Sequence, residues 1–392
     1  MFFQAAGLRL WKNRSLMKRL DFIFFDAGGG HRSAANALRL AVERQDRPWE
    51  IRLVNLQEVL DPLDVFRKYF GIRLQDVYNL LLNKGWTLGS AQLLWVMHQL
   101  IRLYHPKQVR LLEEFWRGRG TDLAVSLVPN LDRAIAESLR KALPGVPFAT
   151  ILTDFADYPP HFWIERESEY LICGSSRAVE QARAQGHSGD RVFRASGMIL
   201  HPHFYEPVAA DREAERRRLG LNPIFPTGLV LFGGQGSSVM IEIAERLDRS
   251  GQALQLILIC GRNRKLREAL RARRFRIPHF VEGFTAEVQY YMHLSDFFIG
   301  KPGPGSISEA LAMKLPVIVE RNAWTMPQER YNADWVVEQG VGLVLPNFRG
   351  IAGAVEQLLE RATFARYRAR AEAIENRAVF EIPEFLDKIM GH

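Results

Sequence analysis

The chain reads GPGSISEA at Gly303–Ala310, directly after the mainly apolar stretch DFFIG at Asp296–Gly300. The apolar stretch predicts a buried strand, and the small residues predict a tight turn into a helix. The first N–H groups of such a helix are unpaired and carry partial positive charge, so they favour a bound phosphate. One turn into the helix stands a carboxylate that is placed to accept hydrogen bonds from a ribose diol. We therefore expect nucleotide contacts from Gly303, Pro304, Gly305, Ser306 and Glu309.

Polar residues also follow the next apolar stretch, Leu315–Glu320. They are Gln328, Glu329 and Asn332. Amides and carboxylates together donate and accept the hydrogen bonds that sugar hydroxyls need. A phosphate site, a ribose site and a sugar site close together in the sequence indicate a nucleotide sugar.

Strand and helix patterns alternate along the chain from Leu20 onward, in two series. Repeated strand–helix–strand units predict mostly parallel sheets with helices on both faces. We therefore predict an α/β protein with two Rossmann-like domains that face each other across a cleft, where ligands bind at the carboxyl ends of the strands. The expected parts are a basic extension at 1–19, a first domain at 20–205, a linker at 206–226, a second domain at 227–375 and a helix at 376–392 that packs back on the first domain.

A glycine-rich loop, AGGGHRS, follows the first predicted strand, Leu20–Asp26. The glycines let the backbone pass close to a ligand, and a helix is predicted to begin near Ser33. We expect Gly29 and Gly30 to form an acceptor loop and His31 to act as a general base, because the pKa of histidine lies near working pH. The alternative is that His31 only caps a helix or orients the loop. The motif lacks the glycine spacing of a dinucleotide-binding fingerprint.

Two loops of the second domain repeat this arrangement. GGQGSS at Gly233–Ser238 follows the first strand of that domain, and GRN at Gly261–Asn263 follows the next one. Backbone amides and hydroxyls of the first loop could receive a diphosphate or the reacting hexose, and an arginine fork suits phosphate. A phenylalanine after a further strand could stack on a uracil ring or, alternatively, fill the core. The candidate donor contacts here are Gly234, Gln235, Gly236, Ser237, Arg262, Asn263 and Phe284.

A pair of acids in the first domain offers another candidate base. Asp154 and Asp157 lie in TDFADY, at the end of the strand predicted at Pro147–Thr153. Two acids at this spacing also suggest a metal site, but no second group of ligands stands nearby in the sequence. We therefore expect no metal, and we expect His31 rather than Asp154 to be the base.

The charge balance points to an anionic surface as a partner. The net formal charge is +8, and residues 1–19 contain five basic residues and no acid. That extension predicts either an arm lying on an anionic membrane or residues ahead of a true start at Met17. The helical stretch Val59–Trp116 mixes aromatic and basic side chains, and we expect Trp86 and Trp95 to face lipid. The alternative is an amphipathic cap whose apolar stripe faces the sheet.

The sequence also predicts where the protein works. No apolar run reaches the roughly 18 residues that a membrane-spanning helix requires. The two cysteines, Cys173 and Cys260, lie far apart on predicted strands and indicate reduced, buried thiols of a cytosolic protein. We therefore expect a peripheral protein on the cytoplasmic face of the cell membrane.

Taken together, these motifs resemble those of one enzyme family. The order GGGH, GGQGS, CGRN, GF, KPGPGSISEAL and QE-x-x-N is similar to that of the monogalactosyldiacylglycerol synthases and processive diacylglycerol glucosyltransferases, which are family 28-like glycosyltransferases. The resemblance runs from about Leu20 to the end of the chain. It implies a GT-B fold, a UDP-hexose donor in the second domain, a lipid acceptor on the first, and inversion at the anomeric carbon with neither metal nor other cofactor.

The resemblance also implies roles for single residues. His31 matches the residue assigned to acceptor binding or base catalysis, Phe284 a uracil contact and Glu309 a ribose contact. Gly305 and Ser306 match the helix start beneath the diphosphate, and the remaining matches are the hexose and phosphate contacts Gln328, Glu329 and Asn332. Three departures stand out: Pro302 replaces the usual alanine, Ser306 replaces a threonine, and Val128–Asn130 lacks a histidine often found in that loop. The last departure bears on the identity of the acceptor.

The expected reaction moves a hexose from UDP-galactose or UDP-glucose to diacylglycerol, or to a glycosyl-diacylglycerol, and makes a membrane glycolipid. The two donors differ at one hydroxyl, which Gln328 or Glu329 could satisfy in either. Alternatives are another lipid-linked or soluble acceptor, such as a peptidoglycan lipid intermediate, and a sugar-nucleotide epimerase. The pI of about 9.6 also raises nucleic-acid binding, but the sequence holds no recognisable module for it, and no nucleic-acid partner is expected.

Overall fold

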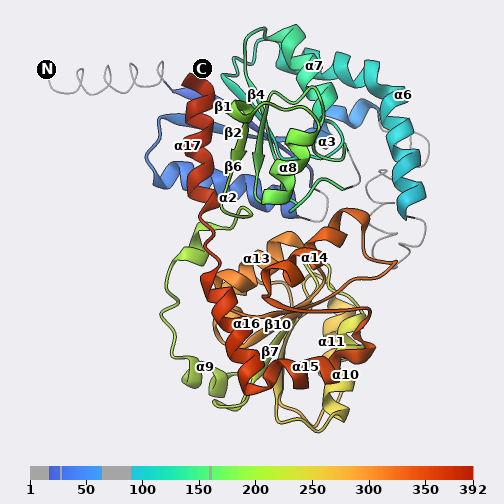
Figure 1. Ribbon diagram of the computed structural model, residues 1–392, viewed down its shortest axis with the longest axis vertical. Coiled ribbons are helices and arrows are strands. Elements are labelled where there is room, and N and C mark those ends of the chain that lie inside the picture. Colours follow the sequence, from blue (N-terminus) through green and yellow to red (C-terminus); the bar gives the residue numbers. More distant parts are fainter. Residues whose placement is uncertain (1–16, 27–28, 64–89, 159–160, 392) are drawn as a thin grey trace, which may run out of the picture.

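The computed structural model describes residues 17–26, 29–63, 90–158 and 161–391, and for residues 90–98 and 100 it describes the backbone alone. Two domains lie one above the other along the long axis of the molecule (Figure 1). Each is built on one sheet, which has six strands in the described chain. The predicted α/β class with two Rossmann-like domains is therefore confirmed.

The N-terminal sheet is parallel throughout, and its strand order is β2-β1-β3-β4-β5-β6. Its central strands are almost continuously apolar and buried, because helices cover both faces. The strand order reverses between β1 and β3, and sheets of this kind bind ligands at that point. The strands are β1 (Lys18–Phe24), β2 (Trp49–Asn55), β3 (Leu123–Ser126), β4 (Phe148–Ile151), β5 (Tyr170–Cys173) and β6 (Val192–Arg194).

The C-terminal sheet is also parallel, with the order β12-β11-β10-β7-β8-β9. Here the order reverses between β7 and β10, so the loops that follow these two strands meet at the switch point. The strands are β7 (Thr227–Leu231), β8 (Gln255–Ile259), β9 (His279–Glu282), β10 (Phe297–Gly300), β11 (Val317–Glu320) and β12 (Gly342–Leu345).

Helices sandwich both sheets. The faces of the N-terminal sheet are covered by α2 and α17 on one side and by α6 and α7 on the other. In the C-terminal domain, α13 and α14 cover one face, while α10 and α15 cover the other. The helices of the first domain are α2 (Gly30–Arg44), α3 (Leu56–Leu60), α6 (Ser90–Trp116), α7 (Asp132–Ala142) and α8 (Ser176–Ala184). Those that follow are α9 (Arg212–Arg218), α10 (Val239–Arg249), α11 (Arg264–Ala272), α12 (Val288–His293), α13 (Pro304–Ala312), α14 (Arg330–Gln339), α15 (Ile351–Leu359), α16 (Arg361–Ala373) and α17 (Ala378–Gly391).

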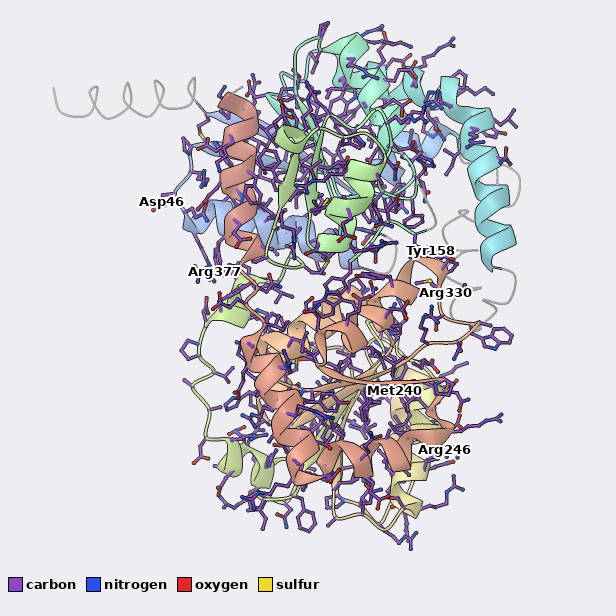
Figure 2. All side chains as sticks on the ribbon, viewed as in Figure 1. Asp46, Tyr158, Met240, Arg246, Arg330 and Arg377 are labelled. Atoms are coloured by element: carbon purple, nitrogen blue, oxygen red, sulfur yellow. The ribbon has the colours of Figure 1, made fainter. Side chains whose placement is uncertain are left out.

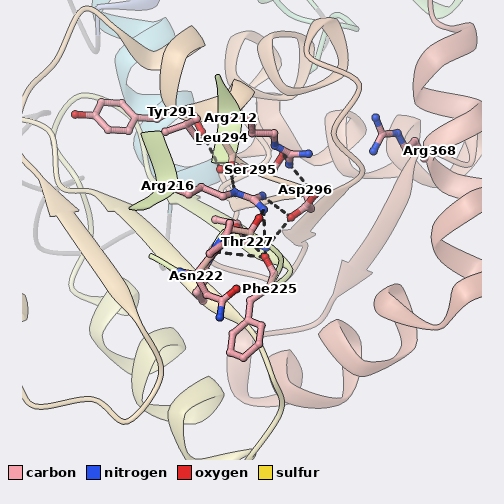
Figure 3. Close-up of polar contacts among 12 residues, drawn as sticks. Arg212, Arg216, Asn222, Phe225, Thr227, Tyr291, Leu294, Ser295, Asp296 and Arg368 are labelled. Atoms are coloured by element: carbon pink, nitrogen blue, oxygen red, sulfur yellow. Dashed lines mark hydrogen bonds and ion pairs between the residues drawn. The ribbon is translucent and has the colours of Figure 1, made fainter. Parts of the chain in front are cut away.

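The linker helix α9 is held to the C-terminal domain by a charged cluster (Figure 3). Arg216 is 4% exposed, and its Nη2 lies 2.8 Å from Oδ2 of Asp296. Arg212 contacts the other oxygen of the same carboxylate at 2.6 Å, and the N–H of Thr227 donates to Oδ2 at 2.8 Å. Because Thr227 begins β7 and Asp296 precedes β10, this cluster fixes the amino ends of the two strands whose carboxyl ends carry the glycine-rich loops.

The chain returns to the first domain through α17, which lies against α2 (Figure 1). Val379, Ile382 and Leu386 of α17 belong to the core of the N-terminal domain. The two segments that cross between the domains are bonded to each other, since the Asn376 side chain donates to the Met198 carbonyl at 2.9 Å and the Arg377 N–H donates to Ser196 Oγ at 2.7 Å. The segments at Ser196–Met198 and Asn376–Arg377 therefore run between the domains as a hydrogen-bonded pair, which we call the paired crossing.

Two further findings concern the whole chain. Within the described residues, no helix is both long enough and apolar enough to cross a membrane. Both cysteines are free and buried, which confirms the prediction of buried thiols.

Candidate functional site

The first half of the site lies at the carboxyl ends of β1, β3 and β4. Helix α2 begins at Gly30, earlier than predicted, because Gly29 takes a left-handed conformation (φ +82°) as the N-cap. His31 is therefore in the first turn of α2. Its Nδ1 lies 3.2 Å from Thr153 Oγ1, and its ring centroid lies 5.7 Å from that of Trp163. Burial lowers the pKa of His31 to about 4, against a smaller raising effect from a hydrogen bond with the Leu127 backbone.

Asp154 follows Thr153, whose hydroxyl contacts this histidine. The carboxylate is 8% exposed and accepts a hydrogen bond from Trp163 Nε1 at 2.9 Å. Burial raises the pKa of Asp154 to about 7, although the Trp163 hydrogen bond favours the ionised form. A base works best when its pKa lies near the operating pH. Burial thus moves the pKa of Asp154 toward neutral pH and that of His31 away from it, which favours Asp154 among the two candidate bases.

Asp157, the other candidate acid, is occupied by its own loop. Its Oδ1 accepts the N–H groups of Phe162 and Trp163 at 2.9 and 2.7 Å, and its Oδ2 accepts that of His161 at 3.0 Å. The side chain is 1% exposed. Asp157 thus fixes the loop that brings Trp163 over His31 and Asp154.

The second half of the site begins with two loops that pack on each other. The Arg262 N–H donates to the Gly234 carbonyl at 2.8 Å, which joins the loop after β8 to the loop after β7. Gly261 has φ +58°, and a Cβ there would lie 2.3 Å from the Gly234 carbonyl oxygen. Only glycine permits this approach. The predicted donor loop Gly233–Ser238 therefore has one fixed neighbour, and its amides lie beside Arg262.

Three predicted residues of these loops have local roles. The Asn263 side chain accepts from the Leu266 N–H at 3.0 Å and caps α11, while Ser237 Oγ lies 3.4 Å from the Val239 nitrogen at the start of α10. Phe284 is 60% exposed, and the Arg262 guanidinium lies 4.5 Å from the centre of its ring. An exposed aromatic ring beside a cation can stack with a nucleobase on its free face.

The turn after β10 forms the centre of the donor half. Helix α13 begins at Pro304, whose ring suits the first helical position. The first helical hydrogen bond runs from the Ile307 N–H to the Gly303 carbonyl at 3.1 Å, so the N–H groups of Gly305 and Ser306 precede it. These two N–H groups and the helix dipole create a place for an anion.

Glu309 lies one turn further along α13. No hydrogen bond or ion pair of its carboxylate occurs within the described residues, and burial alone raises its pKa to about 7. A half-buried carboxylate without a protein partner gains from a ligand that donates hydrogen bonds to it. The position suits the ribose contact expected from the sequence.

Lys301 was not among the residues predicted from the sequence to contact the donor, and it lies between the donor loops. Its Nζ is 2.6 Å from Oε1 of Glu329, and a Cβ at Gly233 would lie 3.8 Å from its Cε. The ammonium group is therefore placed beside both the glycine loop and the start of α13. A lysine directly after a buried strand and before a small-residue turn, KPGPGS, was the signal that could have found it.

The two amides predicted to contact the sugar lie deeper. Asn332 is fully buried and donates to the Pro302 carbonyl at 2.9 Å, so it supports the phosphate turn from below. Gln328 is 8% exposed and lies with Nε2 3.6 Å from the Met326 sulfur, next to Glu329. Of this group, Glu329 is the residue that the structure ties to Lys301 and hence to the mouth of the site.

The two halves face each other. The charges of Glu329 and Lys301, both in the C-terminal domain, act on the titration of Asp154 in the N-terminal domain. The rings of Phe155 and Trp335 stack across the same boundary, with centroids 4.3 Å apart. The candidate base on one domain therefore lies close enough to Lys301 and Glu329 on the other for their charges to act on it.

Two predicted residues fall outside this account. Trp86 lies outside the described residues, and Trp95 belongs to α6 but its side chain is not described. On the described part of α6, Leu103 is 72% exposed among the exposed basic residues Arg102, Lys107 and Arg110.

The sequence is similar to known proteins over most of its length. Residues 228–384 match the family model described as the glycosyltransferase family 28 C-terminal domain. The probable monogalactosyldiacylglycerol synthase 2 (chloroplastic) of Oryza sativa subsp. japonica is 26% identical over 411 residues, which cover 95% of this chain and 81% of that protein.

Two solved structures show the same fold at low identity. The calicheamicin glycosyltransferase CalG4 has a TM-score of 0.62 and 15% identity, over 96% of this chain and 99% of that one. The UDP-GlcNAc 2-epimerase of Neisseria meningitidis, bound to UDP-GlcNAc, has a TM-score of 0.59 and 15% identity, over 95% and 100%. Residues 228–384 are thus similar to the glycosyltransferase family 28 C-terminal domain, the two domains have the GT-B fold, and the chain is similar over almost its whole length to a plant monogalactosyldiacylglycerol synthase.

Proposed function

We propose that this glycosyltransferase transfers a hexose from UDP-galactose or UDP-glucose to diacylglycerol, with inversion at the anomeric carbon. The observation that carries the proposal is the placement of Asp154 opposite Lys301, Glu329 and the start of α13. This arrangement combines a base on one domain with an anion site on the other, as a displacement of a diphosphate requires. The choice of diacylglycerol follows the name of the similar rice protein.

In the proposed donor complex, UDP lies on the C-terminal domain. The uracil stacks on the exposed ring of Phe284 and the ribose diol donates to Glu309. The diphosphate lies against the N–H groups of Gly305 and Ser306, close to Lys301. Arg262 lies beside the glycine-rich loop, because its N–H donates to the Gly234 carbonyl.

The reaction is a single displacement. An acceptor hydroxyl oxygen attacks the anomeric carbon as the bond to the UDP oxygen breaks, and its proton passes to the Asp154 carboxylate. His31, neutral at working pH because of its lowered pKa, contacts the acceptor rather than taking the proton. Negative charge develops on the leaving diphosphate, and preorganised N–H groups together with Lys301 stabilise it. The proposal assigns this charge stabilisation to the chain itself, without a resident metal ion or other cofactor.

We also propose that the protein works as a peripheral protein on the cytoplasmic face of an anionic membrane. An acceptor with two acyl chains must be taken from a bilayer, and exposed Leu103 with its basic neighbours on α6 suits such a surface. Tyr158, 42% exposed, lies between the domains on the side of α6 (Figure 2). We propose that the lipid acceptor enters from that side. The membrane contacts expected from Trp86 and Trp95 remain part of this proposal.

The test is an incubation of the purified protein with diacylglycerol in anionic liposomes and, separately, UDP-galactose or UDP-glucose. We expect glycolipid and an equal amount of UDP from at least one donor, in the presence of a chelator. UDP release that needs a different lipid or a soluble alcohol would overturn the acceptor assignment. Conversion of the donor to another UDP-sugar without transfer would indicate an epimerase and overturn the proposal.

Two variants make the test specific to the site. Glu309→Gln removes the ribose carboxylate and keeps its shape, and it should reduce turnover at low donor concentration. Glu356→Gln, on the exposed surface of α15, is the matched control and should match the wild-type protein. Equal activity of the two variants would refute the donor assignment.

A further inference from the structure

One contact between the two domains has no part in the proposed function. Phe155 belongs to the loop after β4, yet it is 1% exposed and packs in the core of the C-terminal domain. Its ring lies almost parallel to that of Trp335 on α14, with an interplanar angle of 9° and centroids 4.3 Å apart. A large apolar side chain in the core of another domain stabilises one relative placement of the two domains.

The loop that carries Phe155 also carries the candidate base. Asp154 precedes it and is bonded to Trp163, which in turn lies against His31. The Phe155 carbonyl accepts the Ser175 hydroxyl at the end of β5, so the backbone at this point is held from the N-terminal side as well. Any shift of the Phe155 ring relative to Trp335 must therefore move Asp154 relative to the C-terminal domain.

The stack also borders a cavity. This cavity of about 930 Å³ lies at the domain boundary beside the paired crossing, and we call it the hinge-side cavity. Phe155 and Trp335 line it, together with residues of α8, α13 and the paired crossing. None of Asp154, Lys301 and Glu329 is among its described lining residues. Both rings therefore border the hinge-side cavity, while Asp154, the residue before Phe155, is not among the described residues that line it.

We propose that Phe155 and Trp335 are positioning residues: their stack holds Asp154 at reacting distance from the donor half of the site and keeps water of the hinge-side cavity away from it. This inference rests on the proposed function where it concerns turnover. The domain placement itself does not depend on that function, so it can be measured separately.

The stack acts on catalysis through geometry and through the medium around Asp154. A displacement of about 1 Å between a base and its substrate can lower the rate by about 10²-fold. Access of water would relieve the burial that raises the pKa of Asp154, because burial is the largest cause of that shift. Loss of the stack should therefore lower kcat and move the acidic limb of the rate profile to lower pH.

The test compares three variants. Phe155→Leu keeps an apolar side chain and removes the stacked ring. Trp335→Phe keeps an aromatic ring and should retain most of the function. Phe193→Leu is the matched control, because Phe193 stacks on Phe385 of α17 within the N-terminal domain, with centroids 5.2 Å apart. A loss of general stability would affect Phe155→Leu and Phe193→Leu alike.

Domain placement is read from spin labels at Arg183→Cys on α8 and Glu356→Cys on α15, both exposed. The native cysteines are buried and should not take the label. We expect a narrow distance distribution in the parent, in Trp335→Phe and in Phe193→Leu, and a broad one in Phe155→Leu. An unchanged distribution in Phe155→Leu would overturn the proposal whether or not the protein transfers sugar.

Turnover and UDP binding complete the test. Phe155→Leu should lose about 10²-fold in kcat, retain UDP affinity by calorimetry, and show an acidic limb at lower pH, while Trp335→Phe stays within a few-fold of the parent. An equal loss of kcat in Phe193→Leu would overturn the positioning role. If the parent itself transfers no sugar, the proposed function fails, and the spin-label distances still decide the placement of the domains.

Discussion

Replacement of Asp154 by asparagine separates the two candidate bases. The substitution removes the proton acceptor, while the amide oxygen can still accept the Trp163 Nε1–H that lies 2.9 Å away. The pKa of Asp154 is about 7, against an ordinary value of 3.8, and that of His31 is about 4. The two residues therefore titrate in different pH ranges, and the pH dependence of the rate distinguishes them.

The magnitude follows from the ionised fraction. If Asp154 is the base, about half of the molecules are active at pH 7 and about one in a hundred at pH 5, so kcat/KM should fall about tenfold per unit below pH 7. If His31 were the base, the rate would stay level from about pH 8 to pH 5, because its pKa lies near 4. Removal of a general base costs about 10²- to 10⁴-fold in rate, which we expect for Asp154→Asn.

The assay is initial-rate release of UDP from the wild-type protein and from Asp154→Asn and His31→Gln, between pH 5 and pH 8.5. A level wild-type profile together with an Asp154→Asn rate within a few-fold of wild type would refute the assignment. Stability gives an independent check of the pKa. A carboxyl with a raised folded-state pKa destabilises the fold as pH rises from about 4 through 7, by a few kcal/mol when fully ionised. Asp154→Asn should therefore raise the unfolding temperature at pH 8 and leave it unchanged at pH 4.

Three further substitutions test the rest of the structure. Lys301→Ala removes a charge-assisted contact, so the Kd for UDP by calorimetry should rise by about tenfold or more, and an unchanged Kd would place the diphosphate elsewhere. An ionised Glu309 accepts from both hydroxyls of a ribose diol, whereas a protonated Glu309 carries a hydrogen on one of its oxygens. Wild-type affinity for UDP should therefore fall as pH drops below 7, whereas Glu309→Gln should bind more weakly with no such dependence; parallel curves would contradict the ribose contact. Asp296→Asn leaves buried Arg216 without its counter-charge, and we expect the free energy of unfolding by denaturant to fall by about 3–5 kcal/mol. A fall of less than about 1 kcal/mol would show that Asp296 does not anchor α9.

Much of the fold could be predicted because its signals are local. Each buried parallel strand is a short apolar run, and each is followed by a glycine-rich or polar turn, so strands such as β7 and β10 stand out in the sequence. The loops of the donor half could be predicted for the same reason. Their function depends on backbone N–H groups at the start of a helix, and the small residues GPGS at Gly303–Ser306 mark that start directly.

The roles of other residues depend on contacts between distant segments of the chain and could not be predicted from local sequence. Lys301 lies beside Glu329 only because the loops after β10 and β11 meet at the edge of the sheet. Asn263 and Asn332 are expected from the sequence to contact the donor, and the structure adds that one caps α11 and the other donates to the Pro302 carbonyl beneath the phosphate turn. Residue type shows what a side chain can bond to, whereas its partner depends on where the backbone places it.

The sequence by itself determined two parallel α/β domains, the order of the loops that line their facing edges, and the residues of the anion-binding turn. Periodicity and turn chemistry act over a few residues, which is why a linear pattern contains them. The tertiary structure alone decided how deeply each candidate base is buried, and burial moves the pKa of Asp154 up and that of His31 down. It also decided the contact of Phe155 with Trp335, since 180 residues separate them in the chain and only the facing of the two domains brings their rings together.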